Sequence, residues 1–247
     1  MGASGLGWTV TVVLLAGLAV VDYAFRVRPA HSPTLHGAAA WSALYVGLAV
    51  LFGVGVTVVG DAAAGVEYFA CYLSNEALSV DNLFVFLVIV GGFAVPRIAQ
   101  QKVLLFGIVI AVLARTGFIF VGAAVVNTFS WAFYLFALVL FAAAGSLVTP
   151  SAPQGRGAGG AVLRVAKRFL RTSERYHGDR LFVAENGRRV MTPMLLAMIA
   201  VGGADLVFAF DSIPALFGLS QNVYLIFTAT TFSLLGLRQL YFLLDGL

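Results

Sequence analysis

YFACYLSNEALSVDNLFVFLVIVGGFAVP, residues 68–96, is the stretch that decides the fold, because it is apolar for long enough to cross a bilayer. Its middle nevertheless carries five polar side chains: Asn75, Glu76, Ser79, Asp81 and Asn82. An ionised carboxylate at the centre of a bilayer costs at least about 2.5 kcal/mol, so such residues face a bundle interior and mark an ion or substrate path. The stretch therefore predicts a membrane helix with a functional polar side.

A second membrane-length stretch far downstream contains acidic residues in the same way. It includes ADLVFAFDSIPALF, with Asp205, Asp211 and Ser212. Pro214 cannot donate to the carbonyl of Phe210, which predicts a kink or break in this helix. A break would free carbonyl oxygens near Asp211, and broken helices around a central ion site are a recurring transporter design.

The composition places the whole chain in the membrane class. Of its 247 residues, 61% are hydrophobic and 11% are charged, with a mean hydropathy of +0.97. A soluble domain has about 45–50% apolar and about 25% charged residues. The net charge of +4 resides in loops, so it indicates membrane orientation rather than nucleic-acid binding. The single cysteine, Cys71, cannot form a disulfide within this chain and is predicted to be a small core residue.

Seven spanning helices are predicted from runs of about 20 apolar residues. They lie at roughly 8–25, 37–59, 66–95, 103–126, 130–149, 192–216 and 221–244. No basic region precedes the first run and no cleavage site follows it, so we expect a retained helix rather than a signal peptide. The third helix is longer than a span needs, so we expect it to be tilted, kinked or broken near its polar centre.

Loop charges predict the orientation of these helices. Every odd-numbered loop is basic, beginning with Arg26 and Arg28, and every even-numbered loop lacks Lys and Arg. By the positive-inside rule, the N-terminus is outside and the long basic fifth loop is cytoplasmic, in a multi-pass protein of the cell membrane.

The fifth loop divides the chain into a first helical half at 1–149, the loop at 150–191 and a second helical group at 192–247. AVLRVAKRFLR, residues 161–171, predicts an amphipathic helix lying on the anionic leaflet, and a solvated tether is the alternative. Asn186-Gly187 between two β-type runs predicts a hairpin.

Oxygen-bearing side chains form two adjacent stripes on the third helix, because positions seven apart nearly superimpose. One stripe is Glu67, Ser74 and Asp81, and the other is Asn75, Ser79 and Asn82. His31, His36 and His177 all fall in loops. Carboxylates, amides and hydroxyls suit Mg²⁺, Ca²⁺ or Mn²⁺. The predicted metal ligands are Asp81, Asn82, Asp211, Ser212, Asp205, Asn75, Glu76 and Glu67.

Structural roles are the alternative for individual charges. A buried aspartate can pair with a basic residue, and Arg115 in the fourth helix is the candidate partner. Asp22, near Arg26 at the end of its helix, is interpreted as structural. Two membrane aspartates also occur in intramembrane aspartyl proteases, but the required GxGD element is replaced here by GGAD at 202–205. We therefore expect no enzyme activity and no prosthetic group.

LSVDNLFVF (78–86), DLVFAFDSIPALF (205–217) and LGLRQLYFLL (235–244) together resemble the TerC family of integral membrane proteins, named for tellurium resistance. The resemblance implies an all-α polytopic bundle with two pseudo-repeated halves, and because some members of the family look like Mn²⁺ exporters, we expect Mn²⁺ export as the activity. It carries over Asp81, Asn82, Asp211 and Ser212 as residues of the family's acidic motifs.

The chain departs from the family pattern at two positions. Asn75 and Gly202 stand where many members have Glu, which implies a weaker or differently selective cation site. Members also continue past LYFLL, so we expect the last helix to lack packing partners.

Two functions are therefore carried forward. The first is a metal-ion transporter, with Mn²⁺ as substrate and protons as a counter-ion. The alternative is a non-transporting membrane scaffold that docks cytoplasmic stress proteins through the fifth loop.

Overall fold

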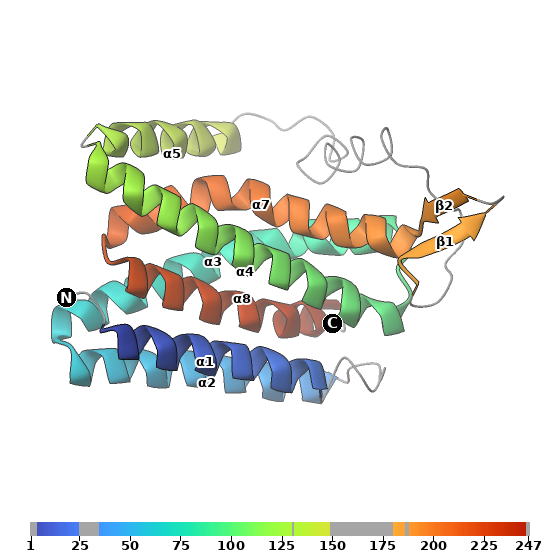
Figure 1. Cartoon of the computed structure of the whole chain (residues 1–247), viewed down its shortest axis with the longest axis horizontal. Coiled ribbons are helices and arrows are strands. Elements are labelled where there is room, and N and C mark those ends of the chain that lie inside the picture. The colour runs from blue at the N-terminus through green and yellow to red at the C-terminus, as the bar shows by residue number, and fades with distance from the viewer. Residues whose placement is uncertain (1–3, 25–34, 130, 149–179, 186–187, 246–247) are drawn as a thin grey trace.

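The computed structural model describes residues 4–24, 35–129, 131–148, 180–185 and 188–245, which form an antiparallel helical bundle with one small hairpin at its end (Figure 1). The helices are α1 (Gly5–Asp22), α2 (Leu35–Val59), α3 (Ala62–Gly92), α4 (Arg97–Thr128), α5 (Ala132–Val148), α7 (Pro193–Leu219) and α8 (Val223–Asp245). The strands are β1 (Phe182–Glu185) and β2 (Arg188–Met191). The prediction of an all-α membrane bundle is confirmed.

Short polar residues start three of these helices. The Ser4 hydroxyl accepts from the Gly7 amide at 3.2 Å, and the Asp61 carboxylate accepts from the Ala64 amide at 2.7 Å. Thr192 caps α7 in the same way, and Pro193 follows it at a position where a missing N–H costs nothing. These caps satisfy amide groups that the helix itself leaves unpaired.

Six helices in the described part of the chain are long and apolar enough to span a bilayer. The fifth predicted spanning helix corresponds to α5. Its 17 residues are at the lower limit of the length that spans a bilayer, and it is not among these six. Large apolar side chains are exposed on the outer faces of the bundle, as expected for surfaces in contact with lipid: Val59, Val66, Leu113, Tyr134, Leu138 and Phe141 are examples.

Neither α3 nor α7 is broken, although a break was among the expectations for both. α3 runs unbroken over 31 residues, and α7 runs unbroken over 27 residues with Pro214 inside it. A proline within a helix costs about 3 kcal/mol. The residues around it are firmly packed, because Ile213, Pro214 and Leu216 are all buried. The predicted break near Asp211 is therefore absent, although Pro214 still has no N–H to donate to the Phe210 carbonyl.

α8 is the most buried of the spanning helices, with 78% of its apolar window inside the protein. It packs against α2, α3 and α4, and α7 packs against α3, α4 and α5. The expectation that the last helix lacks partners was wrong, because the four helices α3, α4, α7 and α8 enclose a common core. The predicted division of the chain into two pseudo-repeated halves stays a prediction.

The core consists of two apolar clusters separated by polar side chains. On α3 one cluster ends at Tyr72 and the other begins at Leu83, and on α4 they are separated between Ala111 and Ile119. The residues at this level form what we call the central polar layer, made up of Asn75, Glu76, Ser79, Arg115, Asp205 and Ser233.

The predicted hairpin is confirmed. β1 and β2 pair antiparallel, with Phe182 opposite Met191 and Glu185 opposite Arg188. The turn residues Asn186 and Gly187, and the predicted amphipathic helix at 161–171, lie outside the described residues.

Candidate metal site in the central polar layer

Arg115 is the centre of the polar layer. Its Nε donates to Asp205 Oδ2 at 3.1 Å and its Nη2 donates to Asp205 Oδ1 at 2.9 Å. Its Nη1 donates to Asn75 Oδ1 at 3.0 Å. Arg115 and Asp205 are each 1% exposed, and Asn75 is fully buried. The sequence-based alternative of an arginine counter-ion is thus confirmed for Asp205, which this two-point contact holds in place.

On the side of the layer that faces α8, some buried polar atoms lack a hydrogen-bond partner. Ser79 Oγ and Ser233 Oγ lie 3.4 Å apart, and Ser233 also hydrogen-bonds the Glu76 carboxylate. Glu76 Oε2 and Asn75 Nδ2 are buried with no hydrogen-bond partner. Leaving a buried polar atom unpaired costs about 1–3 kcal/mol, and more for a charged group. Glu76 Oε2 could therefore bind a cation or a hydrogen-bond donor, whereas Asn75 Nδ2 could donate to a further acceptor.

Asp211 and Ser212 lie about two turns along α7 from Asp205, toward the end of the bundle where α7 meets α8. Asp211 is half-buried and is within electrostatic range of Arg115. Ser212 donates its hydroxyl to the Phe208 carbonyl within its own helix, at 2.8 Å. The structure therefore leaves Asp211 as a second carboxylate near Arg115, and it engages Ser212 with the backbone.

Asp81 and Asp211 lie at different depths along the axis of the bundle. Asp81 follows Asn75 by six residues along α3, and Asp211 follows Asp205 by six residues along α7, which runs in the opposite direction (Figure 1). At 1.5 Å per residue, their backbones are separated by about 18 Å along the bundle. The side chain of Asp81 lies outside the described part of the structure, whereas that of Asn82 is buried.

Glu67 lies about 12 Å along α3 from Asn75, toward the start of that helix. Its Oε2 accepts a hydrogen bond from Ser220 Oγ, at the end of α7. Glu67 therefore belongs to the end of the bundle where α7 meets α8. Among the described acidic side chains, Glu67 and Asp211 thus lie away from the layer that holds Glu76 and Asp205.

No three acidic, histidine or cysteine side chains among the described residues lie close enough together to hold a metal ion. A cation beside Glu76 in the central polar layer would instead meet the Glu76 carboxylate and the hydroxyls of Ser79 and Ser233, because Asn75 Oδ1 already accepts from Arg115. Such oxygen ligands suit hard divalent cations. Arg115 is the internal cation that balances Asp205 in this arrangement.

Sequence reasoning missed the contribution of α8. Ser233 reaches the polar layer, and Arg238 forms a buried ion pair with Asp22 of α1. The Asp22 carboxylate also accepts from Gln239 Nε2 at 3.5 Å. The hydroxyl run TATTFS at 228–233 and the arginine within LGLRQL were the available signals. Asp22 is structural, as expected, although its partner is Arg238 on the last helix.

The arrangement of apolar helices around buried charges agrees with the similarity of the chain to known proteins. Residues 60–247 match the profile described as the integral membrane protein TerC family. The chain belongs to the TerC family. No solved structure matches the chain.

Relatives of this TerC protein cover its whole length. An uncharacterized membrane protein of Mycobacterium tuberculosis is 64% identical over 251 residues, which are 100% of this chain and 63% of that relative. A membrane protein of Myxococcus xanthus is 35% identical over 100% of this chain and 77% of its own length. The Escherichia coli protein named "Putative membrane-bound redox modulator Alx" is 34% identical over 97% of this chain and 77% of its own length. The chain thus spans less than two thirds of the mycobacterial relatives.

Proposed function

We propose that this TerC protein transports a divalent metal ion, with Mn²⁺ as the substrate and export as the direction. The observation that carries the proposal is the buried, unpaired oxygen Glu76 Oε2 in the central polar layer. A carboxylate oxygen kept from water without a donor is an unfavourable arrangement that a bound cation would relieve.

The charge balance of the interior supports the same proposal. The middle sections of α3, α4 and α7 carry Glu76, Asp81, Asp205 and Asp211 but one arginine, Arg115. Arg115 compensates Asp205 and leaves an excess of carboxylates along the bundle. Because Asp81 and Asp211 lie on opposite sides of the layer that holds Glu76 and Asp205, we propose that these residues form a path along which the ion passes from one oxygen cluster to the next.

Arg115 would act on this path as a tethered counter-ion. When no metal is bound, it neutralises Asp205 and engages Asn75. An arriving divalent cation would compete for the same oxygens and repel the guanidinium. We propose that counter-moving protons on the remaining carboxylates drive the cycle.

The test uses cells that lack the gene, complemented with the wild-type chain or with variants and loaded with radioactive Mn²⁺. We expect Glu76→Gln and Asp211→Asn each to slow efflux at least ten-fold. The matched control is Asp61→Asn, which removes a carboxylate at the helix start but retains a good N-cap. Full efflux from cells carrying either interior variant, at equal protein abundance, would count against the transporter.

The scaffold alternative makes the opposite prediction in the same cells. Under that hypothesis, removing residues 150–179 abolishes metal or tellurite resistance, whereas Glu76→Gln and Asp211→Asn leave it intact. The transporter hypothesis requires the two interior variants to lose resistance together with efflux.

A further inference from the structure

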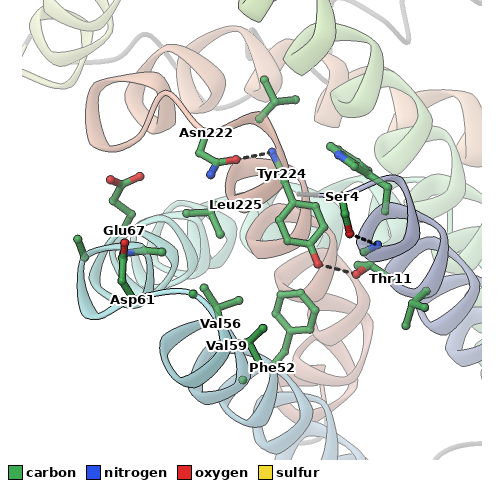
Figure 2. Close-up of a pocket in the computed structure, with 18 of the residues that line it drawn as sticks. Ser4, Thr11, Phe52, Val56, Val59, Asp61, Glu67, Asn222, Tyr224 and Leu225 are labelled. Carbon is green, nitrogen blue, oxygen red and sulfur yellow. Dashed lines mark hydrogen bonds between the residues drawn. The ribbon is translucent and has the colours of Figure 1, made fainter. Parts of the chain in front are cut away.

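A cavity of about 1030 Å³ lies at the outer end of the bundle, away from the central polar layer (Figure 2). It is an open cavity lined by the start of α1, the end of α2, the start of α3 and the start of α8. Glu67, on its α3 side, is separated from Asn75 by about 12 Å along the helix. The proposed transport path therefore does not account for the residues that line this cavity.

Aromatic rings line the cavity together with aliphatic side chains. The rings of Trp8 and Tyr224 have centroids 5.1 Å apart, and those of Phe52 and Tyr224 have centroids 6.3 Å apart. Tyr224 is held in position by a 2.7 Å hydrogen bond between its hydroxyl and Thr11 Oγ1, which Figure 2 shows bridging α8 and α1. Three rings from three helices thus present an aromatic wall of fixed orientation.

The charged residues of the lining are both acidic. Asp61 and Glu67 lie on the same side of the cavity, near the junction of α2 and α3 (Figure 2), and no Lys or Arg among the residues that the structure describes lines it. Each carboxylate uses one oxygen within the protein: Asp61 Oδ1 accepts from Ala64, and Glu67 Oε2 accepts from Ser220. The cavity therefore combines a negative side with aromatic and aliphatic walls.

We propose that this outer cavity binds a hydrophobic organic cation of the quaternary ammonium class, taken from the aqueous phase outside the membrane. The apolar substituents would pack against Phe52 and the aliphatic walls, which gain from being removed from water. The ammonium centre would lie against the faces of Trp8 and Tyr224, an arrangement that stabilises such cations, with Asp61 and Glu67 as counter-charges. A hydrated metal ion would make no use of the aromatic and aliphatic walls.

The test is a titration of the purified full chain in lipid nanodiscs with tetrapropylammonium chloride at constant ionic strength. Binding is followed by calorimetry and by the fluorescence of Trp8, with Trp41 and Trp131 replaced by Phe. We expect saturable binding. Glu67→Gln keeps the acceptor for Ser220 but removes the charge, and it should weaken binding at least five-fold.

Two variants of Tyr224 distinguish recognition by the ring from a merely structural role. Tyr224→Leu should weaken binding at least five-fold, whereas Tyr224→Phe keeps the ring and should stay within two-fold of wild type. Glu185→Gln, on the hairpin at the opposite end of the molecule, is the charge-matched control and should not change the affinity.

Three results would overturn the proposal: no saturable binding, equal affinity in Glu67→Gln and wild type, or displacement of the probe by micromolar MnCl₂. The last would make the cavity a metal vestibule. None of these measurements depends on transport, so the ammonium site and the transporter can fail separately.

Discussion

At the scale of single residues, the Arg115–Asp205 pair is the interaction whose loss should lower the stability of the protein most. Both residues are 1% exposed, and two hydrogen bonds join their side chains. Removing one partner leaves an uncompensated charge in a low-dielectric interior, which costs about 3–5 kcal/mol. We expect Arg115→Met to lower the midpoint of thermal unfolding in detergent sharply.

The double variant Arg115→Met with Asp205→Leu is the control for that prediction. Replacing a buried ion pair by apolar residues of similar size is often neutral, although here Asn75 Oδ1 would lose its donor, at about 1–3 kcal/mol. The double variant should therefore be more stable than Arg115→Met alone. If it is less stable, the pair does not act as a charge-compensated unit.

The residue scale also shows what periodicity can predict. The stripe of Asn75, Ser79 and Asn82 follows from helical spacing, and all three side chains are buried. That Arg115 could be a counter-ion followed from its place in a membrane segment. Which aspartate it pairs with depends on how α4 and α7 are aligned, and a single sequence carries no signal for that alignment.

At the scale of elements, glycines set how closely the helices approach. A Cβ on Gly107 of α4 would lie 2.4 Å from Val201 Cγ1 of α7, whereas a Cβ on Gly117 of the same helix would meet nothing within 4 Å. Small residues at helix contacts let membrane helices pack closely. Gly107 therefore permits the α4–α7 contact that aligns Arg115 with Asp205.

This contrast provides a matched pair of substitutions. Gly107→Ala should destabilise the protein by about 1–3 kcal/mol through overpacking. Gly117→Ala, at an exposed helical position, should be neutral or stabilise by about 0.5–1 kcal/mol because alanine favours the helix. Thermal unfolding of both variants in one detergent checks the difference. A loss of stability in Gly117→Ala as large as in Gly107→Ala would contradict the assignment.

Element-level prediction succeeded for the hairpin, whereas the break expected as one outcome of Pro214 is absent from α7. The hairpin is local, since Asn-Gly between β-type runs specifies its own turn. The consequence of a proline in a helix depends on the surrounding packing. Buried neighbours such as Ile213 and Leu216 keep α7 continuous, and the sequence of α7 alone does not reveal those contacts.

At the scale of the whole molecule, the two ends of the bundle differ in charge. The α2–α3, α4–α5 and α7–α8 connections lie at one end and carry no Lys or Arg. The hairpin and the start of α4 lie at the other end, with Arg97, Lys102, Arg180 and Arg189 (Figure 1). Because loop charges orient membrane proteins, we expect the basic end to be cytoplasmic and the ammonium cavity to open outside.

Labelling of single cysteines tests this orientation, because Cys71 is fully buried and is the one native thiol. In a Cys71→Ala background, Gln221→Cys places a thiol in the α7–α8 connection and Phe182→Cys places one on the hairpin. A membrane-impermeant maleimide should label the first in intact spheroplasts and the second after the membrane is opened. The reverse pattern would invert the orientation. Labelling of both in intact spheroplasts would show that the two ends do not lie on opposite sides of the membrane, which the proposed path along the bundle requires.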